Sequence, residues 1–381
     1  MKLLQEMNVE SKKVILRCDL NVTIKDGKIL SDEKIRASLE TINYLLNKHA
    51  KVIIMSHLGR VETKEDKKDN SLRVVYERLS ELLKGIKVSF CPVTHGQELE
   101  SLINEMQCGD VLLMENTRFE DIDGKKESKN NLELAKYWAG LGDIFINDAF
   151  GVTHRQHASN SGITKYIENG IGFLIQKELE GLKLLINPVH PFVVIMGGAK
   201  VDDKIELIAN VLKKCDYLLV GGGIANTFLA VNHDVGKSLV SEDYIGEVKK
   251  LMAEYPEKII VPVDAVVETG EIKKVNMIND QDIIYDIGPA TIEEYRKYLE
   301  LAETTFINGT AGMYEDKRFA KGTKALLDIC DKAPGVDIIG GGDAVSSVEH
   351  FGLTKKFHFI STGGGATLDY IGSGKLRCLE D

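Results

Sequence analysis

In the first half of the chain, the side chains best able to do chemistry lie where short apolar runs end. One of them instead lies at the start of a helical pattern that follows such a run. These residues are Asp19, Asn21, Arg36, His57, Arg60, Arg118, Asp148 and Arg155. Ligands of open α/β sheets bind at the carboxyl ends of the strands, and a guanidinium group suits a carboxylate or phosphate. One such arginine is more often part of a surface ion pair, but four basic groups at one sheet edge are hard to explain that way. The pattern predicts a cradle for a small, multiply anionic metabolite.

The second half of the chain places glycine clusters after its apolar runs. They are Gly197-Gly198, Gly221-Gly222-Gly223, Gly340-Gly341-Gly342 and Gly363-Gly364-Gly365. Glycine lets the backbone approach a ligand closely and exposes amides at the N-terminus of the next helix, where phosphates are held. Tight turns also use glycine, so one cluster says little, whereas four at one sheet edge predict a nucleotide site.

Charged residues beside two of these clusters are candidates for the same site. A helix that starts after Gly198 would put Lys200 and Lys204 one turn apart on one face, within reach of the ligand. Asp343 is the best single candidate for binding Mg²⁺ together with nucleotide phosphates and water. The alternatives are a solvated helix face for the lysines and a helix N-cap for Asp343.

The apolar runs predict the elements that position these residues. They begin at Lys13, Lys51, Lys87, Asp110 and Asp143 in the first half, and at Pro191, Asp216, Lys258, Thr304, Val336 and Phe357 in the second. Their continuity predicts strands buried on both faces. Helical patterns alternate with them, for example at residues 33–49, 71–85, 204–215 and 291–303. This order predicts an α/β chain with parallel sheets, and eleven strands favour two sheets in two domains.

The stretch 172–191 is predicted to connect the two domains as a helix. Its apolar stripe consists of Ile175, Leu179, Leu182 and Ile186. Pro188 then ends the helix, and the second sheet follows.

The composition narrows the class of protein. The chain has 381 residues, of which 43% are hydrophobic and 28% charged, as in globular proteins with a full core. Lys and Arg number 48 against 58 Asp and Glu, a formal net charge of −10, which disfavours general nucleic-acid binding. The six cysteines form no CxxC pair, so we expect reduced thiols. No secretory signal or membrane-length apolar run is evident, so a cytoplasmic location is expected.

Several known signatures are absent or incomplete. No strand is followed by GxGxxG, which opposes a nicotinamide-dependent oxidoreductase. Gly372-Ser373-Gly374-Lys375 ends like a P-loop, but Leu376 replaces the required Ser or Thr, so a turn is expected. His154 and His157 have metal-ligand spacing without a third ligand nearby, and no metal site is expected there.

Longer motifs resemble the phosphoglycerate kinase family, in order and over almost the whole chain. They are RCDLNV (17–22), SHLGR (56–60), ENTRF (115–119), NDAFGVTHRQH (147–157), GGAKVDDK (197–204), GGGIANTFL (221–229), DIGP (286–289), FAKGTKAL (319–326), IIGGGD (338–343) and STGGGA (361–366). The resemblance implies two Rossmann-like domains, each a parallel sheet flanked by helices, facing each other across a hinged cleft. It implies a glycerate-binding N-terminal domain of residues 1–171 with the C-terminal tail 367–381, a connecting helix at 172–187 and a nucleotide-binding C-terminal domain of residues 188–366.

The implied reaction is reversible phosphoryl transfer between 1,3-bisphosphoglycerate and MgADP, giving 3-phosphoglycerate and MgATP, a step of glycolysis and gluconeogenesis. The glycerate-binding positions carried over are Asp19, Leu20, Asn21, Arg36, His57, Leu58, Gly59, Arg60, Arg118 and Arg155. The positions for ATP or ADP are Gly198, Lys200, Lys204, Gly222, Asn308, Glu315 (ribose hydroxyls), Gly341, Gly342, Asp343 (also Mg²⁺) and Ala344. Arg36 and Lys200 would be the catalytic residues on either side of the moving phosphoryl group. The resemblance also implies a monomer whose partners are these small molecules, without nucleic acid or membrane.

The sequence departs from the family's motifs in places. Ala344 stands where the family has Ser or Thr, which removes a hydroxyl at a helix start close to the phosphates. The loop from Asn308 to Glu315 lacks the family's proline, Val61 also replaces a proline, and the tail after Lys375 lacks the usual LPG. A divergent paralogue that binds nucleotide or glycerate in a regulatory role is therefore the alternative to an active enzyme.

Overall fold

The structure of the chain is a computed structural model that describes residues 2–202, 204–354, 356–376 and 378. The chain divides into two compact units, Met1–Leu179 with Lys375–Asp381, and Glu180–Gly374. The division falls inside helix α5 (Phe173–Ile186), within the stretch predicted to connect two domains. The tail that belongs with the first unit begins at Lys375 and not at residue 367, because residues up to Ser373 form helix α12 of the second unit. Of the predicted tail, residues 377 and 379–381 lie outside the described residues.

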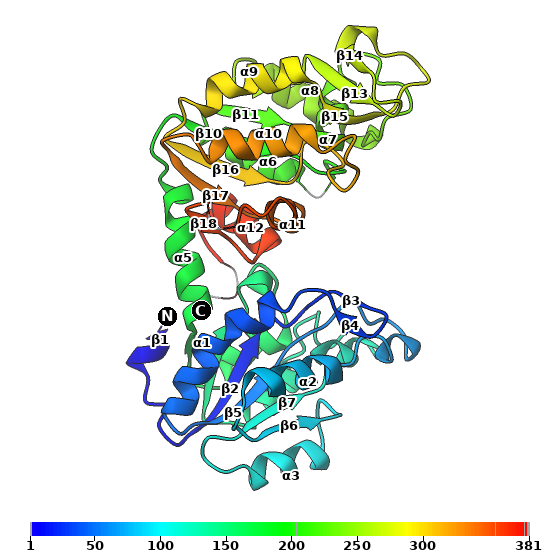
Figure 1. Cartoon of the computed structure of the whole chain (residues 1–381). Helices are drawn as coiled ribbons and strands as arrows, with labels where there is room; N and C mark the ends of the chain where they lie inside the picture. The colour runs from blue at the N-terminus through cyan, green and yellow to red at the C-terminus, as the bar shows by residue number, and fades with distance from the viewer. Residues whose placement is uncertain (1, 203, 355, 377, 379–381) are drawn as a thin grey trace. The chain divides into compact units, whose positions relative to one another are not determined.

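A seven-stranded sheet forms the centre of the first unit, and every neighbouring pair of its strands is parallel (Figure 1). In sheet order the strands are β1 (Lys2–Leu3), β9 (Asn169–Ile171), β8 (Ile144–Asp148), β2 (Lys13–Cys18), β5 (Lys51–Met55), β7 (Val111–Met114) and β6 (Val88–Cys91). The apolar runs predicted β2, β5, β6, β7 and β8. The short strands β1 and β9 were missed because two or three residues carry no readable pattern.

Helices cover both faces of this sheet, which explains why its strands are apolar throughout. Leu16 of β2 belongs to a buried cluster shared with α1 (Glu33–Asn47) and α2 (Arg73–Leu82). Its neighbour Ile15 belongs to a second cluster shared with α3 (Gln97–Glu105) and α4 (Leu132–Ala139). Successive side chains of a strand point to opposite faces, so a sheet with two covered faces needs apolar residues at every position.

The second unit contains a parallel six-stranded sheet. In sheet order its strands are β12 (Ile259–Ile260), β11 (Tyr217–Val220), β10 (Phe192–Met196), β16 (Thr304–Asn308), β17 (Val336–Ile339) and β18 (Phe359–Ile360). Its helices are α6 (Ile205–Leu212), α7 (Gly222–Leu229), α8 (Ile245–Glu254), α9 (Pro289–Leu299), α10 (Lys321–Cys330), α11 (Gly342–His350) and α12 (Gly364–Ser373). The α/β class and the two parallel sheets predicted from the sequence are confirmed.

A small antiparallel sheet in the second unit was not predicted. Its strands, in sheet order, are β14 (Ile272–Lys274), β13 (Asp264–Val267) and β15 (Ile284–Ile287). The prediction of a single strand over the apolar run from Lys258 is wrong. The run divides around Pro262, which has no amide to donate, so its first part forms β12 and its second part forms β13.

The remaining elements are short. A hairpin joins β3 (Ile24–Lys25) and β4 (Lys28–Ile29). Short 3₁₀ helices are η1 (Leu4–Glu6), η2 (Glu65–Lys67), η3 (Thr117–Asp121), η4 (Phe150–Val152), η6 (Ile163–Lys165), η7 (Glu242–Tyr244) and η8 (Val275–Met277), and η5 (Ala158–Gly162) is a π-helical turn. Within the part of the chain that the structure describes, no helix has both the length and the apolar character needed to cross a membrane.

Candidate active site

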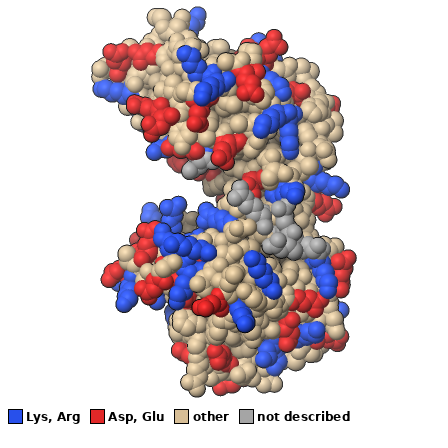
Figure 2. All heavy atoms as spheres, turned by 180° about the vertical axis from the view of Figure 1, so that it is seen from behind, with Lys and Arg blue, Asp and Glu red and all other residues tan. Residues whose placement is uncertain are grey.

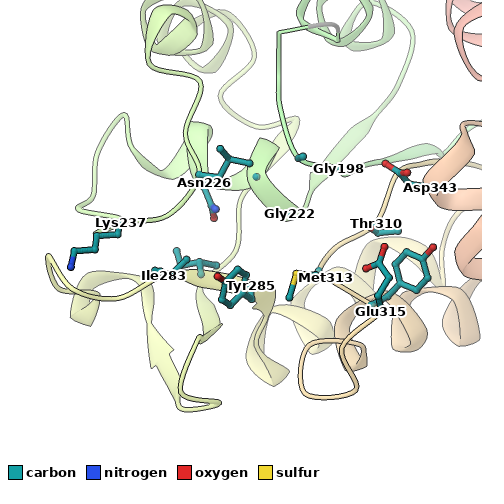
Figure 3. A pocket seen from close by; sticks show the side chains of 16 residues that line it. Gly198, Gly222, Asn226, Lys237, Ile283, Tyr285, Thr310, Met313, Glu315 and Asp343 are labelled. Atoms are coloured by element: carbon teal, nitrogen blue, oxygen red, sulfur yellow. The ribbon is translucent and has the colours of Figure 1, made fainter. Parts of the chain in front are cut away.

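The second unit contains a cavity of about 490 Å³ beside the carboxyl ends of its central strands. Of the residues predicted to bind nucleotide, four line it: Gly198, Gly222, Glu315 and Asp343. They come from the segments that follow β10, β11, β16 and β17 (Figure 3). The expected edge of the sheet is therefore the one that holds the cavity.

The glycines at this edge allow loops to pack backbone against backbone. A Cβ on Gly222 (φ +60°) would lie 2.8 Å from the carbonyl oxygen of Gly198, and one on Gly223 would lie 1.9 Å from that of Ala199. The amide of Gly198 donates to the carbonyl of Thr310 at 3.0 Å, and the amide of Gly222 donates to that of Ala311 at 2.8 Å. These two amides are therefore already used, and the expectation that they point at a phosphate is wrong. Their absent side chains instead let three loops form one wall.

The two lysines do not share a helix. Helix α6 begins at Ile205, after both Lys200 and Lys204, so the predicted helical face is wrong. Val201 is fully buried and its amide donates to the Ser241 hydroxyl at 3.3 Å, which holds this segment in a turn before the helix starts. The Lys204 ammonium donates to the carbonyl of Gly197 at 2.7 Å, at the wall of the cavity. Lys200 is exposed and does not line the cavity.

The loop after β17 presents Asp343 to the cavity. Gly341 (φ +106°) precedes helix α11 as its N-cap residue, and the exposed Asp343 lies in the first helical turn, so the N-cap alternative for Asp343 is wrong. Asn308 is buried beneath this loop and donates to the carbonyl of Gly340 at 2.6 Å. Neither Asn308 nor Gly341 lines the cavity. Asn308 therefore supports the loop from behind, and Gly341 allows the loop to turn.

Ala344 is fully buried in the hydrophobic cluster that includes Val348 and Ile339. Its side chain therefore faces the core and not the cavity. The missing hydroxyl at this position gives no support to the regulatory alternative.

An apolar wall of the cavity was missed by sequence reasoning. It consists of Leu239, Ile283, Ile284, Tyr285 and Met313, and the polar residues Asn226 and Lys237 adjoin it. Figure 3 shows Asp343 and Glu315 toward one end, Lys237 toward the other, and Asn226 and Tyr285 between them. Ile284 and Tyr285 belong to β15 of the unpredicted antiparallel sheet, so no signal could have found them without that sheet.

In the first unit, hydrogen bonds tie together the loops that follow β2, β5 and β7. The amide of Gly59 donates to the Asn21 side chain at 2.8 Å. The Asn116 side chain accepts from the amides of Leu58 at 3.1 Å and Arg118 at 3.0 Å. The predicted residues Asn21, Leu58, Gly59 and Arg118 are thus held together. Leu20 and Leu58 are buried, so their side chains support the loops.

Gly59 is required where the second of these loops turns. It has φ +60°, and a Cβ there would lie 1.9 Å from the Asn70 side-chain oxygen. Asp19 is buried and forms an ion pair with Lys34 at 3.0 Å. This ion pair keeps the pKa of Asp19 below its usual value despite the opposing effect of burial.

Like charges are gathered on this unit, and Figure 2 shows Lys and Arg side chains concentrated over part of its surface. Partial burial, together with repulsion from Arg118 and Arg60, lowers the pKa of Arg155. Burial and the charge of Arg118 lower the pKa of His157 to about 3. Arg118 pairs with Asp121 at 3.1 Å, whereas neither Arg60 nor Arg155 has an ion pair among the described residues. Such a cluster is unfavourable by itself and would be stabilised by a bound anion.

His57 lies at the inner side of this cluster, against a residue that sequence reasoning missed. The fully buried Arg17 lies 3.3 Å from His57 (Nη2 to Nδ1) and donates from Nε to the Ser159 hydroxyl at 2.9 Å. Burial and the charge of Arg17 lower the pKa of His57 well below its usual value, so His57 is neutral at pH 7. Arg17 sits within an apolar strand, and only its place in the RCDLNV motif marked it out.

Arg36 is engaged at the start of α1. Its side chain pairs with Asp32 at 2.9 Å and is about half exposed (52%). Arg78 pairs with the same carboxylate at 2.6 Å. These contacts do not include the other predicted glycerate-binding residues.

Comparison with known proteins decides the family. The family model described as phosphoglycerate kinase matches residues 4–375. The chain belongs to the phosphoglycerate kinase family. It is 47% identical to the phosphoglycerate kinase of Listeria welshimeri over 98% of this chain and 97% of that one, and 48% identical to that of Lacticaseibacillus casei over 97% and 96%.

Solved phosphoglycerate kinase structures share the fold. The enzyme from Coxiella burnetii is 35% identical with a TM-score of 0.85, and the enzyme from Pyrococcus horikoshii is 32% identical with a TM-score of 0.87. Both comparisons cover 100% of this chain and 98% of the other. The resemblance stated from the motifs is therefore confirmed.

Proposed function

We propose that this chain is an active phosphoglycerate kinase, which transfers a phosphoryl group reversibly between 1,3-bisphosphoglycerate and MgADP and yields 3-phosphoglycerate and MgATP. The observation that carries the proposal is the cluster of Arg60, Arg118 and Arg155, in which two arginines lack a carboxylate partner among the described residues. A family member that retains such an unfavourable cluster has a use for an anion at that place. The second unit supplies a separate cavity of nucleotide size.

The phosphoglycerate would bind to the first unit. Arg60, Arg118 and Arg155 would hold its carboxylate and phosphate oxygens, because a guanidinium group forms strong paired hydrogen bonds with such anions. Asp19 and Asn21 would bind its hydroxyl side, and neutral His57 could donate one hydrogen bond without adding charge. Leu20, Leu58 and Gly59 would shape the loops that present these groups.

ATP or ADP would bind in the cavity of the second unit. Glu315 would accept from the ribose hydroxyls, and Lys204 and the loop at Gly341 and Gly342 would lie on the phosphate side. The lining has two exposed carboxylates toward this end, Asp343 and Glu315 (Figure 3). With Glu315 assigned to the ribose, Asp343 remains for Mg²⁺, which is commonly held by one or two carboxylates together with phosphates and water. The donor set therefore fits Mg²⁺ bound with a nucleotide, and the ion would neutralise charge on the phosphate oxygens.

The chemistry requires positioning and charge neutralisation. The phosphoryl acceptor is a carboxylate, already ionised at pH 7, so no side chain must remove a proton. Arg36 and Lys200 would stabilise the charge on the moving phosphoryl group in the transition state. Because the two substrates bind to different units, transfer requires both units in one catalytic complex. We also propose that the protein is monomeric and cytoplasmic and has no nucleic-acid partner.

A coupled assay of the purified protein with 3-phosphoglycerate and MgATP tests the function. We expect turnover that depends on both substrates and on Mg²⁺. Asp343→Asn should raise the Mg²⁺ concentration needed for half-maximal rate, and the exposed Asp69→Asn serves as a matched control. Absence of turnover while calorimetry still detects binding of both substrates would replace the proposal by the regulatory paralogue.

A further inference from the structure

The cavity of the second unit contains a buried side-chain amide whose oxygen has no hydrogen-bond partner among the residues that the structure describes. Asn226, on helix α7 (Gly222–Leu229), lines the cavity and is only 2% exposed. Its Oδ1 is buried and accepts no hydrogen bond from the residues that the structure describes. Buried polar atoms are normally hydrogen-bonded, so an unsatisfied one needs an explanation.

The amide points into the part of the cavity that suits a flat ring. Figure 3 shows the Asn226 side chain directed toward Ile283 and Tyr285, away from the end with Asp343 and Glu315. Apolar side chains, including Met313, line this part. If Mg²⁺ and the phosphates lie near Asp343 and the ribose lies near Glu315, the base of the nucleotide occupies the space beside Asn226.

We infer that Asn226 selects a 6-aminopurine over a 6-oxopurine by pairing with the C6 edge of the base, an inference that rests on the nucleotide site proposed above. The edge of adenine presents the N6 amino donor beside the N7 acceptor, which matches an amide oxygen and an amide nitrogen. Guanine and hypoxanthine present two acceptors there. The carbonyl oxygen of Asn226 then stays unpaired, and a buried unpaired polar atom reduces affinity.

Calorimetry with three nucleoside diphosphates tests the pairing between Asn226 and the base. The experiment is a thermodynamic cycle in which the side chain and the base are altered separately and together. The ligands are ADP, inosine diphosphate and purine riboside diphosphate, which has only hydrogen at C6. The wild-type protein should bind ADP roughly 10-fold more tightly than either analogue, because one hydrogen bond is lost. In Asn226→Leu all three should bind with nearly the same affinity, while the exposed Asn232→Leu should keep the wild-type preference.

Thermal unfolding separates loss of pairing from loss of structure. Asn226→Leu removes an unsatisfied buried acceptor, so the unliganded variant should have a melting temperature at least equal to that of the wild type. Asn226→Ala, which removes the amide with less added bulk, should also lose the preference for ADP and covers the case in which leucine does not fit. Preference for ADP that survives in both variants would overturn the inference. Equal wild-type binding of all three ligands would overturn it and leave the kinase proposal standing, whereas failure of the wild type to bind any of them would overturn both.

Discussion

Arg155 is the residue in which the proposed anion site can be tested most clearly. It is exposed, its Nε donates to the neighbouring His154 ring at 3.0 Å, and it has no ion pair among the described residues. Arg118 and Arg60 repel it and, together with partial burial, lower its pKa. Replacing it by methionine keeps much of the side-chain length and removes the charge. The substitution should therefore harm ligand binding and spare the unliganded fold.

The expected magnitudes follow from these contacts. A hydrogen bond to a charged group contributes about 1.5–3 kcal/mol, and solvent around the exposed Arg155 favours the lower end of that range. A loss of about 1.5–2 kcal/mol corresponds to a roughly 10- to 30-fold increase in the Kd of 3-phosphoglycerate. The unliganded protein loses only repulsion and one hydrogen bond, so its stability should change by less than about 0.5 kcal/mol.

Calorimetry with 3-phosphoglycerate and thermal unfolding of Arg155→Met measure the two effects. Lys84→Met removes an exposed charge elsewhere in the same unit and should leave the affinity nearly unchanged. Unchanged affinity in Arg155→Met would refute the proposed role of the cluster. A melting temperature that falls by about 5 °C or more would instead show that Arg155 stabilises the fold.

Three further predictions concern other parts of the two units. Gly312→Ala should lower the free energy of unfolding in urea by about 1–3 kcal/mol and raise the KM for ADP. The reason is that the new Cβ would lie 2.2 Å from the Asp286 carboxylate and 2.7 Å from a backbone oxygen. The control is Gly246→Ala, which lies in open space on α8 and should raise the free energy of unfolding. His157 has a pKa of about 3, so below pH 6.5 the unfolded chain binds a proton that the folded chain does not, and wild-type stability falls. His157→Gln should lack this loss of stability. Urea midpoints measured at pH 7 and pH 4.5 should therefore show the variant becoming more stable relative to the wild type as the pH falls. A difference in midpoint that is the same at both pH values would contradict this prediction. Lys200→Ala should keep its nucleotide affinity in calorimetry, while the steady-state kcat falls by about 100-fold or more. The reason is that Lys200 contacts the moving phosphoryl group in the transition state. Unchanged turnover would show that Lys200 is not a catalytic residue.

The fold could be predicted where one local pattern determined the outcome. Each central strand is apolar on both faces because helices cover both, as Ile15 and Leu16 show by joining different clusters. The antiparallel sheet could not be predicted, because β13 continues the apolar run of β12 and only Pro262 marks the break. Its pairing with β15 depends on residues about twenty positions away, which no local pattern records.

The site could be predicted at the level of the sheet edge and less well at the level of atoms. Gly198 and Gly222 are at the cavity as expected, but their amides bond to neighbouring loops. Ala344 follows Asp343 directly and yet its side chain enters the core, since successive residues of a helix face different directions. The partners of a buried charge such as Arg17 come from distant parts of the chain, so its role required the tertiary structure.

The central claim is that the first unit binds the acid and the second binds the nucleotide. Hydrogen exchange followed by mass spectrometry can test this with each ligand alone. We expect 3-phosphoglycerate to slow exchange in the segments that contain Asn21, Gly59 and Arg118. ADP with Mg²⁺ should slow exchange in the segments that contain Asn226 and Glu315. Protection of the same segments by both ligands, or protection by 3-phosphoglycerate only in the second unit, would contradict the account.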